Sequence, residues 1–235
     1  MMDKIKRYLR LMFYSARLVA GRKFWIIIPL PLIWLILKAL FIMLGWSNGK
    51  LGPESAHLLM SIPLAVVGMG LGIRLIAGEI DSRTLEIAYT VPGGCHRVWL
   101  AKIATSVSIL LISELVQAFF TMVFFTSVTP GTFYGVFQAS VFYLVAGMGF
   151  AALFRSEITG AMVTVVLFAF NALIGFDRFQ PRVSPFFNPL AIENTDKSQI
   201  LSYTIQNRIF FMILIAALAL LTFSRVERRE KMLRD

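Results

Sequence analysis

Long apolar segments alternate with short polar ones along the whole chain, a pattern that predicts membrane-spanning helices. A helix needs about 20 mostly apolar residues to cross the hydrocarbon core of a bilayer. Segments of this kind occur at residues 24–44, 58–78, 101–127, 134–154, 158–176 and 206–224. We therefore expect an all-α integral membrane protein with six transmembrane helices, in which residues 1–235 form a single transmembrane domain.

Composition and charge agree with this class and indicate an orientation. Of the 235 residues, 57% are hydrophobic and only 15% are charged, whereas soluble domains carry about 25% charged residues. With the N-terminus inside, the cytoplasmic segments 1–23, 74–102, Arg155 and 225–235 hold all but six of the 23 Lys and Arg residues. Basic residues gather on the cytoplasmic side. We therefore expect a plasma (inner) membrane protein with both termini in the cytoplasm.

The net charge of +10 then reflects topology and contact with anionic lipid in the bilayer. It requires no nucleic-acid partner.

Two segments outside the spans carry structural signals. Residues 3–22 are amphipathic, because Ile5, Leu9, Met12, Ala16 and Val19 share one helical face. This predicts an interfacial helix on the inner leaflet, the alternative being a basic flank with accidental periodicity. Residues 177–205 form the longest extracytoplasmic loop, whose prolines bar one continuous helix and whose aromatic residues indicate contact with the outer interface.

A charged segment, residues 79–91, lies between the second and third spans. One helical face holds Ile80, Thr84, Ile87 and Val91, and the other holds polar residues that include Glu79, Arg83 and Glu86. Pro92-Gly93-Gly94 then ends the pattern. We expect a short amphipathic helix on the cytoplasmic face. Its polar face either docks on a cytoplasmic partner, or the helix only lies against lipid.

The same region resembles the type-2 ABC transporter permeases. That family has Gly-Glu, charged residues, Gly-Thr-Leu-Glu, a proline and a lysine that opens the next span. The corresponding residues here are Gly78-Glu79, Asp81-Ser82-Arg83, Thr84-Leu85-Glu86, Pro92 and Lys102. The last span running into a basic tail, "LLTFSRVERRE", is also similar to the family. One departure is Arg83, which stands where the family has glycine.

The resemblance implies that residues 79–91 are a coupling helix in a groove of a separate cytoplasmic ATPase subunit. The implied ATPase-coupling residues are Glu79, Asp81, Arg83, Thr84 and Glu86. The chain would be the permease subunit of an ABC transporter, an exporter, paired with a second permease that is identical or related. It would not be an enzyme and would hold no cofactor, since ATP and Mg would bind only to the ATPase partner.

Three other function classes are distinguished from a permease by the coupling helix or by a catalytic cluster. A membrane anchor that recruits an ATPase for a non-transport role would share the coupling helix, whereas a six-span substrate-binding component would not need it. An integral-membrane enzyme would need a catalytic cluster, and the sequence contains no such motif. Cys95 is the only cysteine, and the two histidines, His57 and His96, fit no metal spacing. The substrate is not indicated.

Polar side chains within the spans are the candidate intramembrane site. Lys38, Glu114, Gln117 and Asn171 lie at similar depth in three spans; Glu114, for example, is about 18 Å along the helix from Lys102. One interpretation is a polar cluster, with a Lys38–Glu114 pair, that gates the path or contacts substrate. The other is that Lys38 extends to the interface and Glu114 is a packing contact with its hydrogen bonds satisfied.

Small residues indicate close helix packing. Gly68 and Gly72 form a GxxxG face in the second span, and Gly147 with Ala151 forms a similar face in the fourth. Such faces let another helix approach closely.

Overall fold

The computed structural model describes residues 13–19, 21, 24–46, 51–81, 95–176, 183–192 and 197–226. Its elements are the 3-10 turn η1 (Phe24–Ile26), α2 (Leu30–Met43), α3 (Pro53–Asp81), α5 (Cys95–Phe124), α6 (Pro130–Phe154), α7 (Glu157–Phe176), the 3-10 turn η2 (Pro189–Ala191) and α8 (Lys197–Val226). The described residues contain no strand, which confirms the all-helical class.

Five helical segments are long and apolar enough to cross a membrane. They are Phe24–Met43, Pro53–Gly78, Val98–Phe124, Pro130–Phe154 and Lys197–Val226. Within α7 the apolar stretch Glu157–Leu173 is shorter, so a sixth crossing remains a prediction. The long apolar helices are those of an integral membrane protein.

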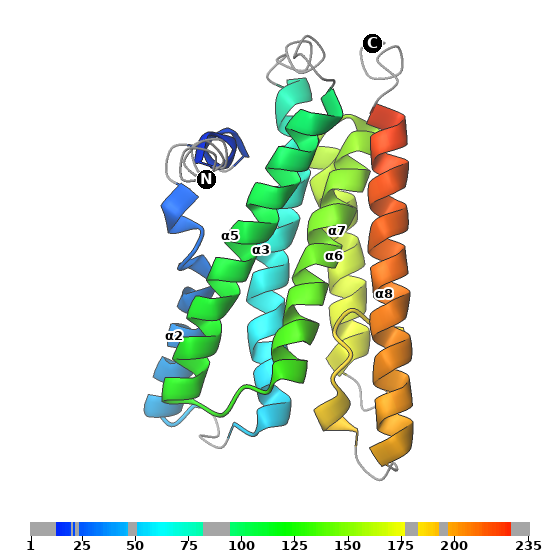
Figure 1. Cartoon of the computed structure of the whole chain (residues 1–235). Coiled ribbons are helices and arrows are strands. Elements are labelled where there is room, and N and C mark those ends of the chain that lie inside the picture. The colour runs from blue at the N-terminus through cyan, green and yellow to red at the C-terminus, as the bar shows by residue number, and fades with distance from the viewer. Residues whose placement is uncertain are drawn as a thin grey trace, which may run out of the picture.

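The long helices run side by side as one bundle, with consecutive helices in opposite directions (Figure 1). Residues 13–19, the end of α3, the start of α5 and the end of α8 lie at one end of the bundle (Figure 1). The starts of α3, α6 and α8 lie at the other. The two ends of the described chain are therefore on the same side, as the charge pattern requires. The side of the membrane that this end faces is a prediction.

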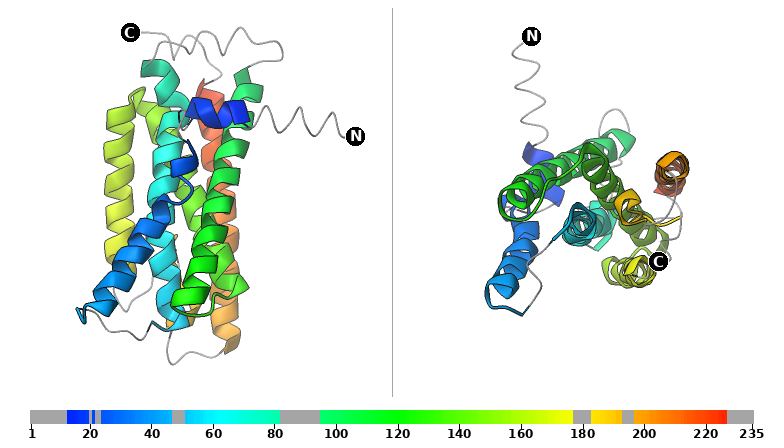
Figure 2. Two further views of the ribbon diagram at one scale, coloured as in Figure 1. Left: turned by 90° about the vertical axis from the view of Figure 1, so that its left-hand side faces the viewer. Right: turned by 90° about the horizontal axis from the view of Figure 1, so that it is seen from below.

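Helices α3 and α6 form the centre of the bundle: α3 packs against α2, α5, α6 and α7, and α6 packs against α3, α5, α7 and α8 (Figure 2). The closest neighbour of α3 is α6, and the predicted glycine face lies at this contact. A Cβ atom on Gly68 would collide with the Ser140 carbonyl oxygen, and one on Gly72 would collide with that of Leu144. From the other side, a Cβ atom on Gly147 would lie 3.0 Å from the Met69 carbonyl oxygen. The missing side chains therefore let the two backbones touch.

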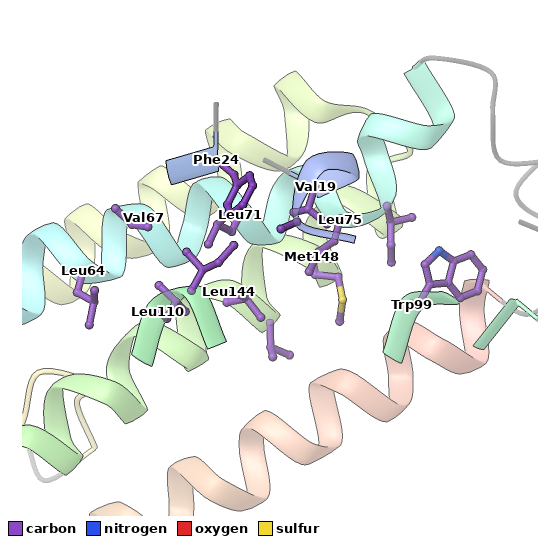
Figure 3. Close-up of a cluster of buried hydrophobic side chains, with 14 of the residues drawn as sticks. Val19, Phe24, Leu64, Val67, Leu71, Leu75, Trp99, Leu110, Leu144 and Met148 are labelled. Carbon is purple, nitrogen blue, oxygen red and sulfur yellow. The ribbon is translucent and has the colours of Figure 1, made fainter. Parts of the chain in front are cut away.

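A cluster of apolar side chains fills the space between α3, α5, α6 and the N-terminal segment (Figure 3). Val19 and Phe24 are buried in it with Leu71, Leu75 and Trp99. The short helix 13–19 lies across the bundle, with Ala16 and Val19 buried and Tyr14 and Leu18 exposed (Figure 2). This agrees with the predicted apolar face for those residues. The rest of segment 3–22, apart from Gly21, lies outside the described residues.

The long loop differs from its predicted form in two ways. Helix α8 begins at Lys197, so residues 197–205 are helical although they were expected in loop 177–205. The aromatic residues Phe186 and Phe187, expected at the membrane interface, are buried. The Phe186 ring stacks on Tyr143 of α6 at 5.6 Å between centroids. Asn188 Nδ2 also donates a hydrogen bond to the Glu54 carbonyl oxygen, which ties the loop to α3.

Candidate functional site

The charged segment is only partly described. Helix α3 continues without a break to Asp81, so residues 79–81, including Glu79, form its last turn rather than the start of a separate helix. Arg83, Thr84 and Glu86 lie outside the described residues, as does the rest of 82–94. Helix α5 then starts at Cys95, directly after Pro92-Gly93-Gly94. The segment therefore connects two helices that both extend beyond the predicted spans.

The helices on either side of this segment are tied together at their shared end. Lys102 on α5 is buried and lies with its Nζ 3.4 Å from the Leu75 carbonyl oxygen of α3, to which it donates. Trp99, one turn earlier, is fully buried in the apolar cluster. Lys102 was selected from the family pattern alone, and Trp99 was not singled out. A displacement at this end therefore acts on α3 and α5 together.

A stripe of buried polar side chains runs along one face of α5. Every side-chain polar atom on the stripe is buried and forms no hydrogen bond of standard geometry with a described residue. Its members, called here the α5 stripe, are Ser106, Ser113, Glu114, Gln117 and Thr121. Their spacing keeps them on the face of α5 that packs inside the bundle, where α5 meets α2, α3 and α6. Sequence reasoning found Glu114 and Gln117 but not the hydroxyl residues.

The Ser and Thr hydroxyls of the α5 stripe do not form the hydrogen bonds that these residues usually form in helices. Such hydroxyls usually donate to the carbonyl four residues earlier, as Thr105 does to Ala101 and Ser108 does to Ala104, each at 2.8 Å. The stripe hydroxyls form no such bond. An unsatisfied buried polar group costs about 1–3 kcal/mol, and native proteins contain few of them. A row of them inside a membrane-length helix is typical of a functional site.

Within the described residues, the structure gives no hydrogen bond between Glu114 and the predicted polar residues of other helices. Lys38 is half-buried on α2, which packs against α3 and α5. Among the described residues, neither carboxylate oxygen of Glu114 forms a hydrogen bond of standard geometry, although the Phe137 backbone of α6 interacts with this carboxyl group. The structure therefore does not form a Lys38–Glu114 hydrogen bond. Asn171 donates to the Leu167 carbonyl oxygen of its own helix at 2.9 Å. That helix, α7, packs against α3 and α6. Of the predicted cluster, only Glu114 and Gln117 are on the same helical face.

An ion pair and an apolar groove, both at the same end of the bundle as the charged segment, were not predicted. Arg74 of α3 forms an ion pair with Glu157 of α7, with Nε and Oε1 3.6 Å apart. An apolar groove of about 220 Å³ lies between α6, α7 and α8. Arg225 lines the groove and donates to the Leu153 carbonyl oxygen at 3.3 Å. A charge pattern could have suggested the ion pair, whereas the groove arises only from packing.

Within the described residues, no group of three or more His, Cys, Asp or Glu side chains could hold a metal ion. No family model matches the chain, and no match to it is found among curated proteins or solved structures. The assignment of function therefore rests on the sequence pattern and on the geometry of the bundle.

Proposed function

We propose that this chain is the transmembrane permease subunit of an ATP-driven ABC transporter, an exporter that works as a dimer of permeases with separate ATPase subunits. The observation that carries this proposal is the charged, helix-patterned segment 79–91 between two membrane-length helices. Its first residues end α3 at Asp81, the rest precedes the start of α5 at Cys95, and its residues resemble the type-2 permease pattern.

The bundle supports a mechanical role for this segment. Helices α3 and α5 are linked next to it by the Lys102–Leu75 hydrogen bond and by buried Trp99. Helix α3 in turn packs against α2, α5, α6 and α7. Close packing transmits displacement between helices because protein interiors have low compressibility. A push on the segment by an ATPase would therefore reach most of the bundle through α3.

The α5 stripe favours transport over a purely anchoring role. An anchor gains nothing from a row of buried polar groups, whereas a path for substrate needs groups that bind transiently. Glu114 and Gln117 are the residues of the stripe with the largest polar side chains. In this proposal, the stripe contacts the transported solute or lines its path once the helices rearrange.

The test is a double charge reversal, Arg83→Glu with Glu86→Lys, in the tagged full-length chain. The variant keeps an oppositely charged pair three residues apart, so helix propensity is roughly retained. We expect the wild type to co-purify with an ATPase activity that depends on Mg and ATP, and we expect the variant to lose that activity while keeping its thermal stability. Purified chain without its partner should not hydrolyse ATP, because it has no phosphate-binding loop.

The matched control is Ile87→Asp, which places a charge on the predicted apolar face. We expect it to lower the thermal stability of the permease itself, unlike the reversal. Undiminished ATPase association and transport in the double reversal would contradict a coupling role. Intact ATPase association without ATP-dependent transport of any solute in proteoliposomes would instead favour the anchor.

A further inference from the structure

The apolar groove between α7 and α8 lies over one face of α6. Both helices pack against α6, and the space between them has a volume of about 220 Å³. Among the described residues, this space, called here the α6 groove, is lined by apolar residues apart from Thr222 and Arg225. The Thr222 hydroxyl donates to the Leu218 carbonyl oxygen at 2.7 Å, so its hydrogen bonding is satisfied within α8. The groove is therefore an apolar space with one charged side chain on its wall.

The gap between α7 and α8 is filled in its other half by the chain itself. Phe186, which precedes η2, stacks on Tyr143 of α6 and packs edge-to-face on Phe168 of α7, with ring centroids 5.8 Å apart. Asn207 Nδ2 of α8 donates to the Ser184 carbonyl oxygen at 3.0 Å. This segment lies between α7 and α8 (Figure 2). The cluster around Phe186 and the groove share Phe142, Leu167 and Leu218. An inserted aromatic ring thus closes one half of the gap, and the other half is open.

The length of the α6 groove matches one leaflet of a bilayer. Along α6 its lining residues run from Phe142 to Leu153, one residue before the helix ends at Phe154. This stretch rises about 17 Å at 1.5 Å per residue, and half of the hydrocarbon core is about 15 Å thick. Two of the lining residues, Leu153 and Leu221, are exposed, so the groove is open to the surroundings of the bundle. Its dimensions fit a lipid tail that enters from one face of the membrane.

Arg225 lies at the end of the groove where a lipid headgroup would be. It belongs to the last turn of α8, and its side chain is partly exposed. Its Nη2 donates to the Leu153 carbonyl oxygen at 3.3 Å, which holds the guanidinium beside the end of α6 without cancelling its charge. Arg155 follows α6 directly and adds a second basic residue at this end. Glu157, at the start of α7, forms its ion pair with Arg74. Basic pockets between transmembrane helices bind anionic lipid headgroups.

The size and the lining of the groove select its occupant. A helix is about 10–12 Å wide with its side chains, so a piece of the same length would fill on the order of 1,000 Å³, far more than the groove holds. Water is disfavoured because apolar walls offer it no hydrogen bonds. An acyl chain needs none and gains free energy with each methylene group that it buries. We propose that the α6 groove binds one acyl chain of an anionic phospholipid, whose phosphate pairs with Arg225.

The test measures lipid binding to the purified full-length chain by native mass spectrometry. The chain is kept in a sterol-based detergent, which has no linear alkyl chain to compete for the groove. One series adds phosphatidylglycerol, and a parallel series adds phosphatidylcholine with the same acyl chains. We expect the wild type to bind phosphatidylglycerol about fivefold more tightly, which is the attraction that one basic residue near a membrane surface exerts on anionic lipid.

Two alanines separate the groove from the rest of the lipid-facing surface. Ala146 lines the groove on α6, so Ala146→Leu places additional carbon atoms in it. Ala217 of α8 is exposed and is not among the lining residues, so Ala217→Leu adds the same atoms elsewhere. We expect Ala146→Leu to weaken phosphatidylglycerol binding by about tenfold or more, because it displaces methylene groups of the lipid. Ala217→Leu should bind like the wild type.

The headgroup contact is tested at Arg225. Arg225→Gln should remove the roughly fivefold preference for phosphatidylglycerol and leave phosphatidylcholine binding unchanged, whereas Arg225→Lys should keep the preference. If Arg225 only held α6 and α8 together, Arg225→Gln would change the binding of both lipids equally, which would contradict the proposed pairing.

Equal binding of the two lipids by the wild type would overturn the proposal. Equal phosphatidylglycerol binding by Ala146→Leu and Ala217→Leu would overturn it as well, by placing the lipid elsewhere. A lipid-free dimer that Ala146→Leu dissociates would overturn it by assigning the groove to a second copy. Leu221→Trp, at an exposed lining position, is a second blocking variant in case Ala146→Leu does not fold. The inference does not depend on the permease role, because no ATPase or transported solute is present.

Discussion

Two helix surfaces inside the bundle, the α3–α6 contact and the inward face of α5, differ in how their buried polar groups are satisfied. Where α3 meets α6, Gly68 and Gly72 bring the backbones together, and the buried hydroxyl of Ser140 donates to the Phe137 carbonyl oxygen at 2.8 Å. On the inward face of α5, polar atoms are equally buried but have no partner among the described residues. Contacts within the first surface stabilise a single arrangement of the helices. The buried polar groups of the second surface lower the stability of the folded protein. Such a loss is expected where helices change their contacts during function.

The largest effect is expected at the first surface. Gly72→Ala would drive a methyl group into the Leu144 carbonyl oxygen, so α3 and α6 would have to separate. Overpacking of this kind costs about 1–3 kcal/mol and sometimes more. The measurement is the midpoint of thermal or denaturant unfolding in detergent. Gly70→Ala is the matched control on the same helix, because a Cβ atom there would have no neighbour within 4 Å. Equal stability of the two variants would show that α3 and α6 do not pack this closely.

A smaller effect, of opposite sign, is expected at the second surface. Thr121→Val keeps the shape of the side chain and removes a buried hydroxyl that has no partner among the described residues. We expect a gain in stability of about 1 kcal/mol or more and a loss of transport activity. The control is Thr164→Val on α7, where the hydroxyl of an equally buried threonine donates to the Gly160 carbonyl oxygen at 2.6 Å. That variant should gain nothing. A matching loss of stability in both would mean that the Thr121 hydroxyl has a partner.

The smallest effect is expected at the rim, where α3 meets α7. The Arg74 and Glu157 side chains are 57% and 37% exposed, and exposed ion pairs contribute about 0–1 kcal/mol. A double-mutant cycle of Arg74→Gln and Glu157→Gln should therefore give a coupling energy below about 1 kcal/mol. Added salt should reduce it further. A much larger coupling would indicate that another subunit covers this pair.

Sequence reasoning recovered the helices better than the sites. The spans were predictable because apolar length is a local property, and each of the six predicted segments overlaps a helix. The start of α8 was missed because residues 197–205 include polar side chains such as Ser198 and Gln199, so the helix extends past its apolar part.

The contacts around the candidate sites depend on which helices become neighbours, and no local pattern contains that information. Glu114 was identified as polar and deep, yet the absence of a hydrogen bond of standard geometry to it among the described residues follows from the placement of α2, α3 and α6. Nothing in the sequence connects Ala146 with Arg225, which line one groove because α7 and α8 pack against the same helix, α6. The family resemblance supplied Lys102, whose contact with Leu75 needs the fold.

The glycine face of α3 has a consequence for how the chain is made. Synthesis proceeds from the N-terminus, so α3 is complete before α5 and α6 exist. Gly68 and Gly72 then present a surface shaped for a helix whose first residue, Pro130, has not been translated. During that interval this surface can be covered by lipid, by the already synthesised α2, by the insertion machinery, or by the α3 helix of another nascent copy. The contact that brings the two backbones together in the finished bundle is thus open to mispairing while the protein is being synthesised.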